Sequence, residues 1–548
     1  MTRSVFAAGI AILLVTAFAD LPAGAVQESI DYQRLEAVVA QGLDPESSEV
    51  MEIASWLTDV YGPRLSGSPN IRAAGDWAVE QMREWGLENV ALEPWTELRG
   101  FTRGWSNEKF YLAAVSPQAF PVYAMSEAWT PGTDGLVRGP AVLATGTTEE
   151  DLAPLRGKLR GAFVLIQDPV DVAAYWTPQA TRRTTEELDR LQLRSNPGPE
   201  FGTAPAAGGR GGGRGGGGQP FDRMAFFRAE GAAAVLATTA RGHGLFLSSG
   251  NRAADPETTL PDIRVAAEHY NRVARLLLKD IPVTLEADIR NVFHPDPEMF
   301  NVVGEIRGTD KADEVVMLGA HFDSWHPGTG ATDNAAGSAA MLEAMRLLKV
   351  AGVPLRRTVR IALWNGEEQG LNGSRNYAEA HFAACTPDPA APPENEGGGR
   401  GGRGTVPGVL VVRPEHARFS TYFNIDNGTG AIRGVFLQGN TAVAPVFRAW
   451  IEPLRAIGLT HLSIRGTGGT DHLAFDAVGL PGFQFIQDAI EYSTVTHHYN
   501  MDTYERLQPD DMRRNATIAA AFAFLAANRE EPLPRKPLPG CRAPANAG

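Results

Sequence analysis

Seven Asp, Glu and His residues in the second half of this 548-residue chain are of types that can bind divalent metals. They are His321, Asp323, Asp333, Glu367, Glu368, Asp426 and His498. Carboxylates that crowd together repel one another unless a cation compensates, and imidazole nitrogen combined with carboxylate oxygen suits zinc. The residues therefore predict a metal site, provided that the fold brings them together.

Each of these residues taken alone has a simpler explanation. An isolated Asp before a helix, such as Asp333 in "GTGATDN", is usually an N-cap, and an isolated His is usually structural or exposed. Their joint placement favours the metal site, because His321, Glu367 and Asp426 each follow a separate apolar run.

The apolar runs alternate between strand-like and helix-like patterns from residue 301 onward. Strands are expected at 315–320, 358–364, 422–425 and 482–486, and helices at 335–350 and 444–457. Buried strands that alternate with helices predict an α/β fold, a three-layer sheet with helices on both faces. Such sheets place their chemistry beyond the carboxyl ends of the strands, where the candidate ligands stand.

The rest of the chain predicts an insert. Residues 122–290 contain short β-like runs bounded by Gly or Pro, which predict an inserted, mainly β domain. We expect residues 26–121 to form the N-terminal part of the domain that continues in 291–548. Gly/Arg-rich tracts at 206–220 and 394–406 lack interleaved aromatic residues, so they predict surface loops rather than RNA-binding segments.

The first residues predict export. Residues 1–25 have the order of a signal peptide: a charged start, an apolar run and small residues before a cleavage point after Ala25, with Ala19 as the alternative. An apolar run of about 14 residues is shorter than the roughly 20 that span a bilayer. We expect a secreted or periplasmic protein with no membrane span after cleavage. In such a compartment Cys385 and Cys541 can pair if they lie close enough.

Composition excludes several classes of protein. A formal charge of −14 argues against nucleic acid as a partner, because phosphate binding needs clustered Lys and Arg. A hydrophobic fraction of 43% and a charged fraction of 21% are typical of globular proteins. The sequence also lacks a GxSxG-type elbow, which disfavours a serine hydrolase.

Four segments carry a specific resemblance. They are "GAHFDSWHPGTGATDNAAGSAAMLEAMRLL", "ALWNGEEQGLNGS", "FNIDNGTG" and "THHYNMDTYERL", and their order and spacing resemble those of the co-catalytic zinc aminopeptidase and carboxypeptidase Q family. "YGPRLSGSP" resembles the N-terminal part of that family. "LRGKLRGAFVLIQ" and "AFFRAEGAAAVLATT" resemble the protease-associated domain that several members carry as an insert. The resemblance implies a zinc-exopeptidase, phosphorylase/hydrolase-like fold with such an insert.

The resemblance also implies two zinc ions per chain. Asp333 would bridge both ions, His321 and Asp426 would complete one site, and Glu368 and His498 would complete the other. His498 is preferred to His497 because the family places this ligand four residues before the Asp of an Asp-Thr pair, here Asp502.

Three further roles follow from the resemblance. Glu367 would be the general base, and Asp323 would accept a hydrogen bond from the imidazole of His321. The segment "GTDHLAF" places His472 beside the substrate cleft, where it would help to stabilise the tetrahedral intermediate.

The expected activity is hydrolysis of terminal peptide bonds of peptides. The Asp333-Asn334 pair looks more like the aminopeptidase version of the motif than the Asp-Asp of carboxypeptidase Q, which favours an aminopeptidase. The alternatives are a carboxypeptidase Q-like dipeptidase, a glutaminyl cyclase and a non-catalytic binding ectodomain on the same fold. The sequence leaves the oligomeric state open, and a homodimer occurs among relatives that resemble carboxypeptidase Q.

Overall fold

The structure is a computed structural model that describes residues 28–193, 221–389 and 405–544. The expected signal peptide and the Gly/Arg-rich tract at 206–220 lie outside these residues. The second tract, 394–406, also lies outside them except for its last two residues, which begin strand β14 (Thr405–Val412).

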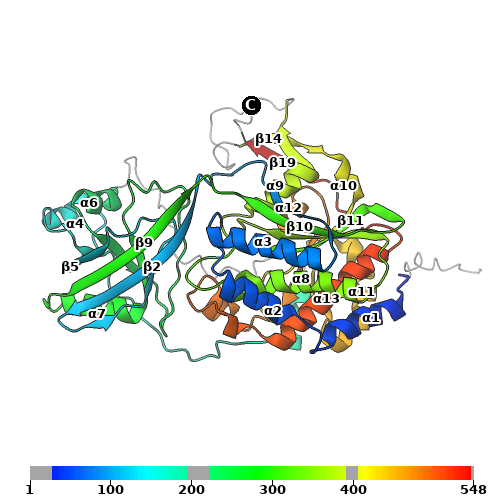
Figure 1. The fold of residues 1–548 in the computed structure, drawn as a ribbon, viewed down its shortest axis with the longest axis horizontal. Coiled ribbons are helices and arrows are strands. Elements are labelled where there is room, and N and C mark those ends of the chain that lie inside the picture. Colours follow the sequence, from blue (N-terminus) through cyan, green and yellow to red (C-terminus); the bar gives the residue numbers. More distant parts are fainter. Residues whose placement is uncertain (1–27, 194–220, 390–404, 545–548) are drawn as a thin grey trace, which may run out of the picture.

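The described residues form two lobes, each built on its own large sheet (Figure 1). The main sheet has eight strands within the described chain, in the order β1 (Glu88–Pro94), β10 (Phe300–Ile306), β12 (Arg357–Trp364), β11 (Lys311–His321), β15 (Phe419–Asn424), β18 (Gly482–Gln487), β16 (Ile432–Phe436) and β17 (His461–Ser463). The four strands β12, β11, β15 and β18 are parallel, so their carboxyl ends meet at one edge.

Helices cover both faces of the main sheet, which confirms the α/β prediction. Alternate residues of β11 face opposite ways: Val316 and Leu318 pack in the core formed with α8 (Ala336–Val350) and α13 (Pro509–Asn528). Met317 packs with Phe475 on the other face. That face is covered by α9 (Asn372–His381), α10 (Pro414–Arg418) and α12 (His472–Asp476).

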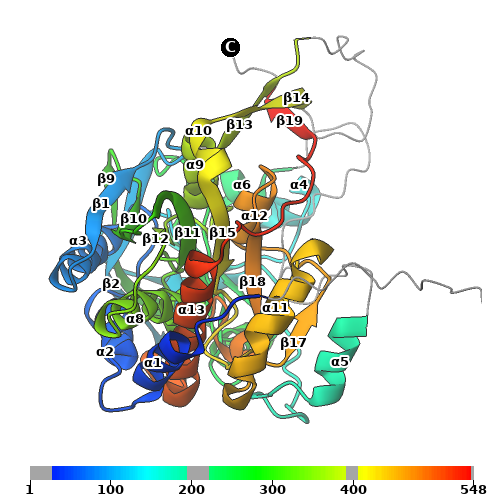
Figure 2. The same cartoon turned by 90° about the vertical axis from the view of Figure 1, so that its right-hand side faces the viewer.

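The first of these faces carries most of the helical mass. Figure 2 shows α1 beside α13 and α8. Apolar residues of α2, α3 and α11 also pack in this core. The bounds of these helices and of α1 are α1 Tyr32–Leu43, α2 Val50–Ser55, α3 Pro69–Glu84 and α11 Ala444–Ile451. At the start of helix α3 the Ser68 hydroxyl accepts a hydrogen bond from the N–H of Ile71, and proline occupies the first helical position.

The second lobe holds the other large sheet. Its order is β3 (Phe120–Pro121), β2 (Arg103–Ser116), β9 (Thr284–Pro295), β5 (Leu136–Leu143), β6 (Phe163–Leu165), β7 (Ala234–Thr238), β8 (Asp262–Val265) and β4 (Ala124–Ser126). Helices α4 (Glu149–Leu152), α6 (Arg223–Ala229) and α7 (Ala267–Leu277) belong to this lobe. The sheet takes in β2, which ends before residue 122, because β2 pairs with β9 along almost its whole length.

An extended segment of the second lobe reaches across to the main lobe and ends in α5 (Thr185–Leu193). The apolar face of α5 packs on β16 and β18. Arg182, just before this helix, pairs with Asp488 at 3.1 Å and with Asp511 at 2.7 Å. These contacts fix the second lobe to the main lobe at a point distant from β2 and β9.

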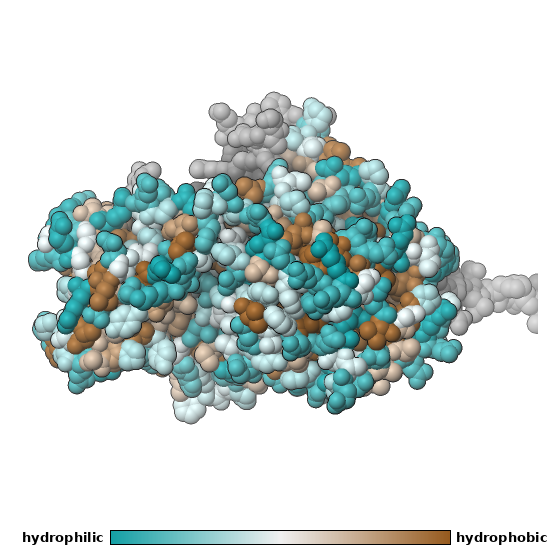
Figure 3. All heavy atoms as spheres, viewed as in Figure 1, coloured by the Kyte–Doolittle hydropathy of each residue, from teal (hydrophilic) through white to brown (hydrophobic). Residues whose placement is uncertain are grey.

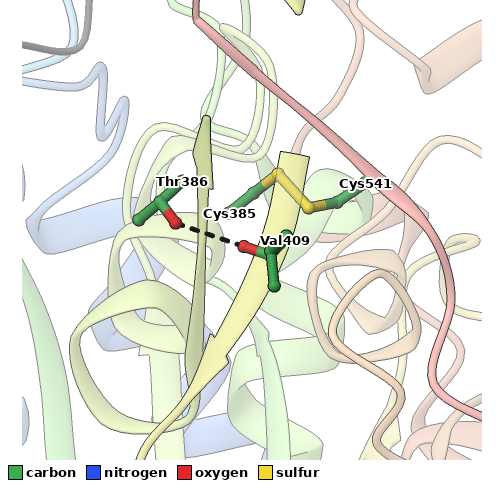
Figure 4. The surroundings of a disulfide bond; sticks show 4 residues. All are labelled: Cys385, Thr386, Val409 and Cys541. Atoms are coloured by element: carbon green, nitrogen blue, oxygen red, sulfur yellow. Dashed lines mark hydrogen bonds between the residues drawn. A yellow bond between two sulfur atoms is a disulfide. The ribbon is translucent and has the colours of Figure 1, made fainter. Parts of the chain in front are cut away.

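A small sheet in the order β13 (Ala383–Pro387), β14 and β19 (Cys541–Pro544) carries the C-terminal end of the described chain. Cys385 of β13 and Cys541 of β19 form a disulfide, so the two cysteines do lie close enough to pair. Figure 4 shows this bond beside the hydrogen bond from the Thr386 hydroxyl to the carbonyl of Val409.

The face drawn in Figure 3 is mostly hydrophilic, with hydrophobic side chains in small scattered groups over the described residues. Within the described part of the chain, every helix is too short or too polar to cross a membrane.

Candidate active site

The predicted metal ligands meet at the carboxyl edge of the parallel strands. His321 ends β11, Glu368 lies four residues beyond the end of β12, and Asp426 lies two residues beyond the end of β15. Asp333 stands in the turn just before α8, and His498 follows β18 after a loop. The fold thus brings together five residues that are up to 177 positions apart in the sequence.

Asp333 lies at the centre of this group. Its Oδ1 is 3.1 Å from His321 Nε2, which is also 3.4 Å from Asp426 Oδ1. Its Oδ2 is 3.4 Å from His498 Nε2, which is 2.9 Å from Glu368 Oε2. One carboxylate therefore faces two separate pairs, each with one imidazole and one carboxylate.

The chemistry of these atoms fits bound cations. Nδ1 of His321 lies 2.9 Å from the main-chain oxygen of Asp323, which can only accept, so Nδ1 donates and the lone pair of the neutral ring is on Nε2. That lone pair faces the carboxylates of Asp333 and Asp426. Within the described chain, Asp333 Oδ2 and Glu368 Oε1 are buried without a hydrogen-bond partner. Electron-rich atoms aimed at one another are the arrangement that a metal ion satisfies.

Electrostatics support the same conclusion. Burial raises the pKa values of Glu367 and Glu368 well above the ordinary range of glutamate. Burial also acts to raise the pKa of Asp333, but the nearby imidazoles of His321, His497 and His498 outweigh it and hold that pKa below its usual range. Several buried carboxylates at one point need positive charge, and metal ions supply it.

Asp323 acts differently from the prediction. Its carboxylate Oδ1 lies 3.7 Å from His321 Nδ1, and the main-chain carbonyl of Asp323 takes the imidazole hydrogen bond instead. The carboxylate accepts hydrogen bonds from the N–H groups of Glu367 and Glu368, at 3.1 and 3.3 Å, and from the Ser66 hydroxyl at 3.0 Å. Asp323 therefore positions the turn that carries both glutamates.

Asp502 positions the turn that carries Asp333. Its carboxylate accepts hydrogen bonds from the N–H of Thr332 at 2.7 Å and of Asp333 at 3.1 Å. Burial raises the pKa of Asp502 to about 7. In the sequence, Asp502 served only as the reference position that locates His498. Its position four residues after that histidine is the signal that connects it to the site.

Arg64, from "YGPRLSGSP", was not predicted to take part in the site. It is fully buried, and burial lowers its pKa to about 10. The guanidinium donates to the carbonyls of Phe322 at 2.8 Å, Leu57 at 2.6 Å and Gly330 at 3.0 Å. It thus joins the end of β11, next to His321, to the loop that leads to Asp333.

Replacing Arg64 by methionine is expected to destabilise the protein by at least about 3 kcal/mol, because several buried carbonyls lose their donor. Urea unfolding followed by fluorescence measures this. The matched control is Arg72→Met, which removes an exposed arginine paired with Asp76 and is expected to cost less than about 1 kcal/mol. Equal stability of the two variants would contradict the role of Arg64.

The structure does not bring His472 to the substrate side of this site. Its side chain is fully buried, contacts the amide of Gln438 and lies 3.2 Å from the carbonyl of Thr467. Thr470 and Leu473, its neighbours in sequence, line the cavity instead. Burial lowers the pKa of His472 to about 4, so the side chain is a neutral imidazole of the interior.

A cavity of about 480 Å³ opens beside the candidate ligands. It is lined by Asp333, Glu367, Glu368, Gly370, Leu371, Arg375, Asp426, Asn427, Gly468, Gly469, Thr470, Leu473, Tyr492, His497 and His498. The sequence predicted no role for Tyr492 or Arg375, and His497 was the alternative to His498 that the family motif disfavoured. The Tyr492 hydroxyl lies 3.4 Å from Asp426 Oδ1, and His497 Nε2 lies 3.8 Å from Asp333 Oδ2.

A second hollow of about 370 Å³ adjoins Glu368. It is lined by residues 250–253 of the second lobe and by Trp325 and Gln369 of the main lobe. The second lobe therefore forms part of the wall near the candidate metal ligands.

The fold and the site together are those of a metallopeptidase. Residues 301–523 match the sequence profile described as "Peptidase family M28". Carboxypeptidase Q of Rattus norvegicus is 25% identical over 482 residues, which cover 87% of this chain and 85% of the relative. An aminopeptidase of Pseudomonas aeruginosa is 40% identical over 115 residues, 21% of this chain and 20% of that relative.

Solved structures support the fold. A peptidase M28 precursor from Shewanella amazonensis has a TM-score of 0.62 at 22% identity and covers 93% of this chain and 100% of that one. A zinc aminopeptidase from Bacillus subtilis has a TM-score of 0.51 at 18% identity and covers 88% of this chain and 94% of that one. The main sheet and its helices are thus an arrangement known among peptidases.

Proposed function

We propose that this chain is an exported zinc exopeptidase that removes the N-terminal residue from short peptides and holds two zinc ions. The observation that carries the proposal is the carboxylate of Asp333, which faces His321 and Asp426 on one side and Glu368 and His498 on the other. Nitrogen and oxygen donors in these numbers suit zinc. Sites with two metal ions about 3.5–4 Å apart recur in aminopeptidases.

Glu367 is the proposed general base. When bound, zinc polarises the scissile carbonyl and makes a nearby water more acidic. Glu367 lines the cavity, and within the described chain none of the hydrogen bonds ends on its carboxylate. It is therefore free to take a proton from the attacking water and to return it to the departing amine. Asp323 holds Glu367 in place through its main-chain N–H.

The second lobe is proposed to be an inserted protease-associated domain. The support is its position: it adds residues 250–253 to the wall beside Glu368. Export is proposed from the order of charged, apolar and small residues in 1–25.

The test is metal content of the purified protein, measured beside hydrolysis of an aminoacyl anilide, an unblocked dipeptide and an N-blocked dipeptide. About two zinc ions per chain, with cleavage of the first two substrates and not the third, is the expected result. Cleavage of the N-blocked dipeptide alone would indicate a carboxypeptidase instead of an aminopeptidase. Ammonia release from an N-terminal glutamine would indicate a glutaminyl cyclase, and a metal-free protein without activity would indicate a binding ectodomain.

A further inference from the structure

Arg375 is a cation on the wall of the catalytic cavity that the proposed mechanism does not use. It lies in the first turn of α9, eight residues after Glu367, and its side chain is exposed to solvent. Among the described residues that line the cavity, it is the one arginine or lysine, while the acidic lining residues are Asp333, Glu367, Glu368 and Asp426. Arg375 is therefore the one permanently positive side chain among these described residues, beside four acidic ones.

The guanidinium of Arg375 has no hydrogen-bond or ion-pair partner within the described part of the chain. Neighbouring arginines are engaged: Arg252 donates to the carbonyls of Gln369 and Arg99, and Arg99 itself pairs with Glu379. The donors of Arg375 are thus available to a molecule that enters the cavity.

The chemistry of a guanidinium defines what that molecule carries. Arginine offers a planar fork of N–H donors that matches a carboxylate through two parallel hydrogen bonds. Ligand cavities measure roughly 300–1,000 Å³, and this one, at about 480 Å³, is in the lower part of that range and suits a peptide of a few residues. In so small a space the free C-terminus of a short peptide lies near its scissile bond.

We propose that Arg375 binds a carboxylate of the substrate, so that the preferred substrates are dipeptides and tripeptides with a free C-terminus. This inference rests on the proposed exopeptidase function and narrows its substrate class. The ligands around Asp333 and the base Glu367 act on the scissile bond, and Arg375 selects the peptide by its negative end. Arg375 is a specificity residue in this scheme and takes no part in proton transfer.

The experiment compares kcat/KM for Leu-Ala, Leu-Ala amide and Leu-Glu amide in wild type, Arg375→Ala, Arg375→Lys and Arg448→Ala. Arg448 is an exposed arginine of α11, a helix that contributes no residue to the cavity lining, and it serves as the matched control. In Arg375→Ala, the kcat/KM for Leu-Ala divided by that for Leu-Ala amide is expected to fall by roughly tenfold to a hundredfold, mainly because the KM for Leu-Ala rises. Lysine should restore part of the ratio, because it keeps the charge without the fork.

The kinetic results distinguish failure of this inference from failure of the proposed function. An unchanged ratio in Arg375→Ala, with all three peptides cleaved, overturns this inference and leaves the proposed function standing. A loss in Arg375→Ala that is confined to Leu-Glu amide overturns the preference for a free C-terminus, because it assigns the carboxylate that Arg375 binds to an acidic side chain. A wild-type protein that cleaves none of the three peptides overturns the proposed function, and the inference falls with it.

Discussion

Replacing Glu367 by glutamine is expected to lower kcat by roughly 10²–10⁴-fold, the usual contribution of a general base, while the metal content stays at the wild-type value. Glutamine keeps the shape of the side chain and cannot accept the proton of the attacking water. Among the described residues, the ion pairs that join His321 and His498 to carboxylates involve Asp333, Asp426 and Glu368 but not Glu367. Steady-state kinetics and metal analysis of the same preparation measure both parts of the prediction.

The neighbouring glutamate provides the contrast. Glu368 Oε2 lies 2.9 Å from His498 Nε2, so Glu368→Gln is expected to lose metal as well as activity. The two variants make the same chemical change one residue apart, and Asp323 holds the main chain of both residues. Loss of metal in Glu367→Gln, or a kcat near that of wild type, would remove Glu367 from the role of base.

The positions of His321, Glu367 and Asp426 were accessible from sequence for a physical reason. Each follows an apolar strand, and parallel strands end at the same edge of a sheet. The prediction of an α/β sheet with helices on both faces therefore also predicted that these three residues lie close together. The assignment of His498 came from the resemblance, since a loop separates it from β18 and its φ of 65° has no signature in the sequence.

Other features depend on contacts that periodicity does not encode. Arg64 satisfies carbonyls from segments more than 250 residues further along the chain, and a buried arginine looks like any surface arginine in the sequence. His472 stands between cavity-lining residues in sequence, but the short helix α12 turns its side chain into the interior. The pairing of β2 with β9 joins residues about 180 positions apart, so a local sequence pattern cannot predict where the second sheet begins.

Replacing Asp333 by alanine is expected to have the largest effect on metal binding, because this carboxylate faces both ligand pairs. Activity should fall to background, and the affinity for zinc should drop by more than the roughly 10- to 100-fold that indirect changes around a metal site cost. Asp502→Asn is the matched comparison: it weakens the hydrogen bonds that hold the Asp333 turn and should stay within that smaller range. Equilibrium dialysis against zinc measures both affinities.

Thermal unfolding distinguishes loss of the site from loss of the fold. In the metal-free protein the pKa of Asp333 lies below its usual range, so the ionised carboxylate stabilises the fold at neutral pH, and the metal-free unfolding temperature of Asp333→Ala should lie below that of wild type. Zinc stabilises only the state that binds it, so it should raise the unfolding temperature of wild type and leave that of the variant unchanged. If the variant were stabilised by zinc as strongly as wild type, Asp333 would not be a shared ligand, and the two histidines would have to hold their metals through Asp426 and Glu368 alone.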